Sequence, residues 1–210
     1  MAEFSDVFSW DYSDLKVYDK NIIQHTIPVN LDKIIFHQKL RRINPKLFPS
    51  IEKEVNRLYK YGIIVPIHFS EWLSNLVLVR KKTEEIRLSI DFTNLNKVSL
   101  KDNYPLSKMD HVLQRVVGSF RMSLVDRYSG YNQILVHRGD QLKTTFKTPQ
   151  GTFMYSKIPF GLKNVGVPFQ RDMDIDFTNE KDIFLVIYLD DLTFFSKSYE
   201  EHLHHLRIVF

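Results

Sequence analysis

Residues 183–195 read Ile-Phe-Leu-Val-Ile-Tyr-Leu-Asp-Asp-Leu-Thr-Phe-Phe, so two apolar runs flank the adjacent carboxylates Asp190 and Asp191. Branched and aromatic residues suit a buried, pleated surface, and each run has the length of an ordinary strand. The stretch predicts a β-hairpin with both aspartates at its tip. Two like charges repel beside a hydrophobic sheet unless a cation lies between them. Ordinary polar turn chemistry is an equally good interpretation of this stretch alone.

A second predicted strand also ends in a carboxylate. Residues 120–126 alternate in character and end at Asp126. If this strand lies beside the hairpin in one sheet, three carboxylates converge. Such a cluster suits magnesium, which prefers a few carboxylates together with phosphate oxygens and water. Two such ions would activate a 3′-hydroxyl and bind the pyrophosphate leaving group, so the cluster predicts a nucleotidyl transferase.

Composition sets wide limits on the class of protein. The 210 residues are 43% hydrophobic and 26% charged, which is typical of a soluble globular chain of one domain or slightly more. A net charge of +4 permits a polyanionic partner without requiring one. The absence of cysteine excludes disulfides and cysteine-ligated metals. No signal peptide or membrane-spanning run is visible, so we expect an intracellular protein that binds no membrane.

Periodicity predicts the other elements. Strand patterns favour a short strand at 63–66 and two hairpins, one from 76–79 and 86–92 and one from 143–148 and 152–156. Helical spacing favours helices that end before Gly62 and Gly118, a helix over 167–179, and a last helix capped by Ser198 and Glu201. The first of these begins near Asn44-Pro45, and its regular part begins at Ser50 because Pro49 falls inside the span.

Two further patterns carry alternatives. In the helix over 167–179, Pro168 must lie in the first turn, and Asp172, Asp174 and Asp176 make the helix more acidic than a buried helix normally is. The histidines at 202, 204 and 205 favour an ordinary helix over a metal site, because only the pair spaced by three residues shares a face.

Cationic residues gather in two places. Arg80, Lys81, Lys82 and Arg87 lie at the tip of the first hairpin, where they would meet a triphosphate. The segment from Lys33 to Lys46 is either a solvated amphipathic surface or a contact along a template strand.

Several motifs resemble those of reverse transcriptases. Residues 188–191, Tyr-Leu-Asp-Asp, match the Tyr-x-Asp-Asp box of that family. Residues 124–134 resemble the first catalytic motif of the gypsy class of long-terminal-repeat retrotransposons, and the other similar stretches are 38–42, 71–75, 91–92 with 95–97, 159–164 and 200–203. The resemblance implies an α+β fold, the fingers and palm of a right-hand polymerase with an antiparallel palm sheet.

The resemblance also implies domain boundaries. An extended lead-in would cover 1–31, and the reverse transcriptase domain would cover 32–210. Its fingers would take about 32–100 and 137–158, and its partial palm about 101–136 and 159–210. The resemblance stops at Phe210, so we expect the thumb to be missing, with the rest of the palm, the thumb and a ribonuclease H region in a full-length polyprotein. We therefore expect this chain alone to lack processive synthesis.

The resemblance implies a catalytic role for each acidic residue. Asp126, Asp190 and Asp191 would bind two magnesium or manganese ions, and the backbone carbonyl of Arg127 would complete one site. The reaction would be RNA-directed DNA synthesis from deoxynucleoside triphosphates on a primed RNA or DNA template.

The resemblance also implies residues that bind nucleotide and nucleic acid. The ring of Tyr131 would exclude ribonucleotides, and Arg87, with Lys81, would hold the triphosphate. Phe160 and Gly161 would line the nucleotide and template side. Gln170 would touch the template-primer.

Departures from the family pattern support an alternative. Thr83-Glu84 and Ile86 replace residues of the fingers turn, Thr93 replaces an arginine, and Pro168 replaces a residue with an N–H. Asp176 and Glu180 stand where the family is usually apolar. The alternative is a catalytically inactive retrotransposon relic that at most binds nucleic acid, and a third reading is a scaffold recruited by the host.

Overall fold

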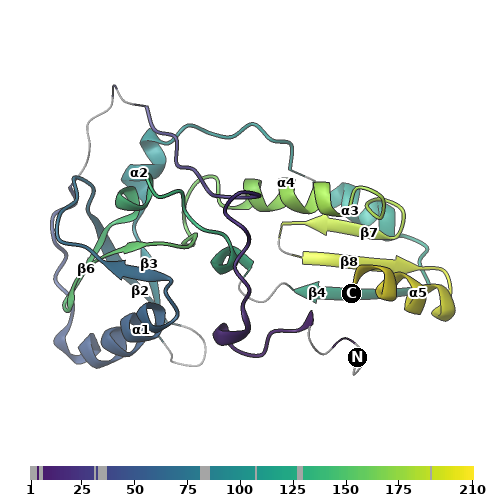
Figure 1. The fold of residues 1–210 in the computed structure, drawn as a ribbon, viewed down its shortest axis with the longest axis horizontal. Helices are drawn as coiled ribbons and strands as arrows, with labels where there is room; N and C mark the ends of the chain where they lie inside the picture. Colours follow the sequence, from purple (N-terminus) through teal and green to yellow (C-terminus); the bar gives the residue numbers. More distant parts are fainter. Residues whose placement is uncertain are drawn as a thin grey trace. The chain divides into compact units, whose positions relative to one another are not determined.

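Two units make up the chain (Figure 1). The computed structural model describes residues 4, 7–30, 32, 37–80, 86–106, 108–126, 130–189 and 191–210. Unit 1 comprises residues 1–15, 102–130 and 166–210, and unit 2 comprises residues 16–101 and 131–165. Among the described residues, no helix has both the length and the apolar character needed to cross a membrane.

Unit 1 contains an antiparallel three-stranded sheet. Its strands are β4 (Arg121–Asp126), β7 (Leu185–Tyr188) and β8 (Asp191–Ser196), in the order β4-β8-β7. Strands β7 and β8 form the hairpin that the apolar runs of 183–195 predict. Tyr188 pairs with Asp191, which leaves two residues in the connecting turn. The predicted strand that ends at Asp126 is also confirmed.

Helices pack against this sheet. Helices α3 (Met109–Val116) and α4 (Gly166–Asp176) contact β7, whereas α5 (Tyr199–Val209) contacts β8 and β4 (Figure 1). Each lies where helical spacing predicts a helix, although α4 ends three residues early. The capping of α5 is half as predicted: Ser198 Oγ accepts from the Glu201 N–H, but the Glu201 carboxylate accepts from Lys197 N–H. A short 3₁₀ turn, Tyr12–Asp14, belongs to the same unit.

One face of the unit 1 sheet is its core. Leu185, Ile187 and Phe194 are at most 1% exposed, and the antiparallel register places all three on one face. On the opposite face, Met122 and Leu124 of β4 stay exposed. Because Asp126 follows Leu124 at the two-residue period of a strand, it lies on that open face.

Unit 2 contains a five-stranded sheet. Its order is β1-β6-β5-β2-β3, with bounds β1 (Ile64–Pro66), β2 (Ser74–Arg80), β3 (Ile86–Ile90), β5 (Phe146–Thr148) and β6 (Gly151–Tyr155). The two predicted hairpins are confirmed as β2–β3 and β5–β6. The pairing between β2 and β5 is parallel and was not predicted.

Two helices accompany the sheet of unit 2. Helix α1 (Phe48–Lys60) begins two residues before the predicted start, so that Pro49 lies in its first turn. A proline is tolerated there because the N–H that it lacks would have no intrahelical partner. Asn44 caps a preceding 3₁₀ turn, Pro45–Leu47, instead of α1. Helix α2 (Thr93–Val98) was not predicted. Further 3₁₀ turns span Gly130–Gln133, at the boundary of the units, and Gln141–Thr144.

Candidate active site

Two of the three predicted carboxylates meet across the sheet of unit 1. Asp126 is the last residue of β4, Asp191 is the first residue of β8, and the antiparallel register places them directly opposite each other. Directly opposed residues of an antiparallel pair project from the same face, with Cβ atoms about 4.5–5.5 Å apart. Both residues are exposed. The pairing therefore gives two carboxylates that open toward solvent from one edge of the sheet.

Other predicted residues lie outside the described part of the chain. These are Asp190, Arg127 and Lys81. Arg87 is placed by its backbone in β3, opposite Val79 of β2. Their roles stay predictions. Among the described residues, no group of three potential metal ligands comes together.

The turn that precedes Asp191 holds an unusual backbone conformation. Leu189 has φ of 54°, in the left-handed region. A two-residue hairpin turn of the favoured types requires a positive φ at its first position, which glycine or asparagine normally supplies. Holding a residue such as leucine there costs about 1–2 kcal/mol. The rest of the unit must therefore stabilise this turn.

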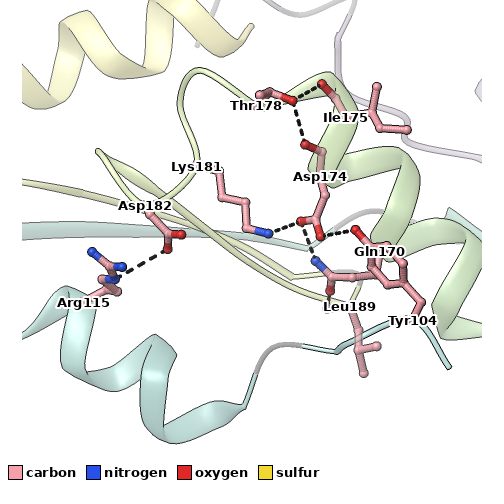
Figure 2. Close-up of polar contacts among 9 residues, drawn as sticks. All are labelled: Tyr104, Arg115, Gln170, Asp174, Ile175, Thr178, Lys181, Asp182 and Leu189. Atoms are coloured by element: carbon pink, nitrogen blue, oxygen red, sulfur yellow. Dashed lines mark hydrogen bonds and ion pairs between the residues drawn. The ribbon is translucent and has the colours of Figure 1, made fainter.

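Gln170 of α4 supplies part of that support. Its Oε1 accepts from the Leu189 N–H at 2.9 Å, and its Nε2 donates to Asp174 Oδ1 at 3.0 Å (Figure 2). Gln170 is 1% exposed. We predicted a contact between Gln170 and the template-primer, but both ends of its amide are engaged inside unit 1. A direct contact would require these bonds to break, so burial weighs against that role.

In unit 2, Tyr131 and Phe160 form an aromatic pair. Their rings meet edge to face with centroids 5.3 Å apart, and Tyr131 is 7% exposed whereas Phe160 is 53% exposed. Edge-to-face contact is a favourable arrangement of two rings. The ring of Phe160 is thus exposed and packs against the buried ring of Tyr131. The predicted roles of both residues toward a nucleotide stay predictions.

The loop that follows Phe160 is fixed by a residue with no predicted role. Asn96 donates from Nδ2 to the Gly161 carbonyl at 2.7 Å and accepts at Oδ1 from the Lys163 N–H at 2.8 Å. Gly161 has φ of 95°, which side-chain-bearing residues rarely adopt. The family resemblance includes Asn96 in a similar stretch, but sequence alone gave no sign of this contact.

A polar groove of about 630 Å³ lies in the same unit. It is lined by His37, Gln38, Lys39, Arg41, Asn75, Asp91, Thr93 and Asn94. Hydrogen bonds from Thr93, opposed by partial burial and aided by Arg41, lower the pKa of Asp91 below its ordinary value. Arg41 Nη2 lies 2.5 Å from Asp91 Oδ2, so one positive charge of the segment from Lys33 to Lys46 is paired with a carboxylate.

Comparison with known families decides what kind of chain this is. The model of the family described as reverse transcriptase (RNA-dependent DNA polymerase) matches residues 79–210. The chain belongs to the reverse transcriptase family. The matched part contains all the carboxylates predicted to bind metal, and the match confirms the family that the Tyr-x-Asp-Asp box indicated.

Relatives of this reverse transcriptase chain come from mobile elements and from a plant. The Pol polyprotein of transposon 412 of Drosophila melanogaster is 29% identical over 100% of this chain and 17% of its own length. The corresponding polyprotein of transposon gypsy from the same organism is 30% identical over 76% of this chain and 16% of its own length. An RNA-directed DNA polymerase homolog of Oenothera berteroana is 38% identical over 59% of this chain and 89% of its own. The chain thus spans about a sixth of the polyproteins.

Solved structures confirm the fold. The foamy viral protease-reverse transcriptase in complex with an RNA/DNA hybrid superposes with a TM-score of 0.80 at 22% identity, over 94% of this chain and 27% of that protein. The native prototype foamy virus enzyme gives a TM-score of 0.77 at 21% identity over the same shares. The predicted α+β polymerase fold of fingers and palm is therefore correct.

Proposed function

We propose that this chain forms the fingers and part of the palm of an RNA-directed DNA polymerase. It would add deoxynucleoside triphosphates to a primer 3′-hydroxyl with two divalent cations. The observation that carries the proposal is the register that sets Asp126 opposite Asp191 at the end of the β4–β8 ladder. Family membership supports the same chemistry.

The residues at this edge fit a hard divalent cation. Asp126 and Asp191 offer exposed carboxylate oxygens, the ligand type that magnesium and manganese prefer. We assign Asp190 and the main-chain carbonyl of Arg127 to the same site. Bound there, the cations would supply Lewis-acid activation of the primer hydroxyl and charge stabilisation for the leaving group.

The remaining assigned residues would bind and orient the substrates. The primer 3′-oxygen forms a bond to the α-phosphorus while the bond to the leaving pyrophosphate breaks, and the hydroxyl proton goes to solvent. Arg87 and Lys81 would hold the triphosphate, since cationic side chains pair well with phosphate oxygens. Tyr131, with Phe160 and Gly161, would line the sugar and template side. The exposed ring of Phe160 and its support by Tyr131 agree with a surface that receives a base or a sugar.

Nucleic acid is the partner that the comparisons favour. One structural neighbour is a foamy viral protease-reverse transcriptase in complex with an RNA/DNA hybrid, and another is in complex with double-stranded DNA. A chain with the same fold and a net charge of +4 suits a primed template.

Primer extension by a chimera tests the proposal. Residues 1–210 would replace the matching segment of the transposon 412 polyprotein, and DNA synthesis would be measured on a primed RNA template with magnesium and deoxynucleotides. We expect extension that Asp126→Asn and Asp191→Asn each reduce by more than about a hundredfold, because even indirect partners of a metal site cost 10–100-fold. Asp110→Asn, an exposed carboxylate of α3, is the control and should retain activity.

The same experiment separates the inactive alternative. If the chain is a relic, the chimera should fold and bind primed template with strong salt dependence but extend no primer. Asp126→Asn should then change neither its binding nor its lack of extension. That result would contradict the proposal.

A further inference from the structure

Helix α4 and strand β7 are joined at two points by one polar network (Figure 2). Gln170 and Asp174 lie four residues apart on α4, so they share one face of the helix. Gln170 Oε1 accepts from the Leu189 N–H, just after β7, and Gln170 Nε2 donates to Asp174 Oδ1. Lys181, four residues before β7, donates from Nζ to the same Asp174 oxygen at 2.6 Å. The network therefore holds both flanks of β7.

Asp174 is the centre of this network. Besides Gln170 and Lys181, it accepts from the Tyr104 hydroxyl at 2.7 Å through Oδ2. Its side chain is 14% exposed. Three donors from three separate segments thus converge on one carboxylate. Removing that carboxylate would leave the Gln170 amide without the acceptor that orients it toward Leu189.

The protonation states of Asp174 and Tyr104 favour these hydrogen bonds. Partial burial opposes ionisation of Asp174, but hydrogen bonds from Lys181, Tyr104 and Gln170 outweigh it and lower the pKa of Asp174. Burial, together with the bond to Asp174, raises the pKa of Tyr104 to about 12. At neutral pH the carboxylate is therefore ionised and the phenol keeps the proton that it donates.

The backbone at each end of β7 shows what the network must hold. Asp182, next to Lys181, has φ of 63°, and Leu189 has φ of 54°. Positive φ at residues other than glycine persists only where the surroundings determine it, and such residues cluster at functional sites. The Leu189 peptide leads directly into positions 190 and 191. Its orientation therefore bears on how the chain enters β8 at Asp191.

We infer that Asp174 is a positioning residue for the metal-binding turn, acting through Gln170 on the Leu189 peptide, with Tyr104 and Lys181 fixing its carboxylate. The inference rests on the proposed function in one respect, the assignment of Asp191 and its neighbour to metal. The role assigned to Asp174 is to orient Gln170, and it includes no contact with metal or substrate. The network accounts for one of the three aspartates of α4, Asp174.

Amide exchange at Leu189 tests the network directly. The 210-residue chain, labelled with ¹⁵N-leucine, reports Leu189 together with Leu185 of β7 and Leu192 of β8. Asp174→Leu and Gln170→Met should accelerate exchange at Leu189 by about tenfold, the equivalent of one ordinary hydrogen bond, and leave Leu185 and Leu192 unchanged. Asp174→Asn keeps an acceptor for Gln170 and should restore most of the protection.

A matched control removes a different charge beside β7. Arg115 pairs with Asp182 at 3.7 Å on the surface, and neither residue bonds to Gln170 or Asp174 in Figure 2. Arg115→Gln should leave Leu189 exchange at the wild-type rate. Wild-type exchange at Leu189 in Asp174→Leu would overturn the inference. Equal acceleration of all three leucines in Asp174→Leu and Asp174→Asn would also overturn it, because that pattern indicates a general structural role.

Manganese titration of the same proteins connects the network to the site. Asp174→Leu should weaken manganese binding by about 10–100-fold, the range for residues that orient metal ligands. Adding Leu189→Asn should recover part of the affinity, because asparagine tolerates the left-handed conformation.

The two proposals fail in different ways. If Asp126→Asn and Asp191→Asn weaken manganese binding while Asp174→Leu does not, the positioning inference is wrong and the site assignment stands. If no substitution changes manganese binding, the proposed function is wrong, and the exchange rate of Leu189 alone decides whether Asp174 holds the turn.

Discussion

Units 1 and 2 hold their buried polar side chains in different ways. In unit 1, Gln170 bonds to Asp174, and His202 of α5 lies 2.8 Å from Ser123 Oγ of β4 and 3.1 Å from Ser196 Oγ of β8. These contacts join side chain to side chain, and the one between His202 and Ser123 joins elements that are distant in sequence. The His202 contacts tie α5 to β4 and β8, and the bond from the Leu189 N–H to Gln170 ties α4 to the end of β7.

In unit 2, buried polar side chains bond instead to the main chain. Asn164 Nδ2 donates to the Leu100 carbonyl at 2.7 Å, and Asn75 Nδ2 donates to the Lys39 carbonyl at 2.7 Å. A backbone carbonyl is present whichever residue occupies the position. A side-chain partner, by contrast, is lost when its residue is substituted. Substitutions should therefore couple to one another more strongly in unit 1 than in unit 2.

The largest expected effects come from the apolar cores. Phe194 of unit 1 and Phe146 of unit 2 are both 0% exposed, and truncation of a buried phenylalanine to alanine costs about 3–5 kcal/mol. Phe194→Ala should accelerate amide exchange mainly in residues 108–126 and 166–210, and Phe146→Ala mainly in 37–101 and 131–165. If exchange rises equally in both units after either substitution, the two units unfold together, and the distinction between them would be wrong.

A pH effect of similar size is expected in unit 2. Burial lowers the pKa of His25 to about 4, with partial opposition from Asp140, whereas an unfolded histidine titrates near 6.5. The unfolded chain therefore binds more protons between these values, and unit 2 should lose about 3 kcal/mol of stability as pH falls from 6.5 to 4. Denaturant unfolding of wild type and His25→Leu at both pH values measures it. An identical pH dependence in the two proteins would refute the assignment to His25.

The smallest effect tests coupling in unit 1. Burial, with Arg121 and His205 nearby, lowers the pKa of His202, so the ring is neutral at pH 7. His202→Leu should cost about 1–3 kcal/mol because it leaves the Ser123 and Ser196 hydroxyls without that partner. Ser196→Ala in the His202→Leu background should cost less than in wild type, by at least about 0.5 kcal/mol. Strictly additive costs in the four-protein cycle would contradict the side-chain network.

Local sequence patterns predict most of the helices and strands correctly. The hairpins β2–β3, β5–β6 and β7–β8 are made by neighbouring runs of apolar residues, so alternation and turn residues suffice to find them. Helix α2 was missed because it has six residues and Leu95 is its buried residue, too little for a helical period to appear. The parallel pairing of Ser74 with Phe146 joins distant segments, and no local pattern encodes it.

In the candidate site, too, local patterns identify some residues, whereas contacts between distant segments are not predicted. Asp126 and Asp191 could be singled out from sequence because each ends or begins an apolar strand, and the family motif supports both. The family resemblance assigns Gln170 to the template-primer, and nothing in the sequence shows that α4 brings its amide to the Leu189 N–H. The acidity of α4 is visible in the sequence, but the convergence of Tyr104 and Lys181 on one of its aspartates, Asp174, depends on tertiary packing.

Manganese binding shows whether Asp126 and Asp191 form one metal site. The measurement is an electron paramagnetic resonance titration of the 210-residue chain with Mn²⁺, for wild type, Asp126→Asn, Asp191→Asn and the control Asp110→Asn. We predict that Asp126→Asn and Asp191→Asn each weaken binding by about tenfold or more, since each removes a charged ligand, and that Asp110→Asn binds as wild type does. Equal manganese affinity in all four proteins would contradict the account.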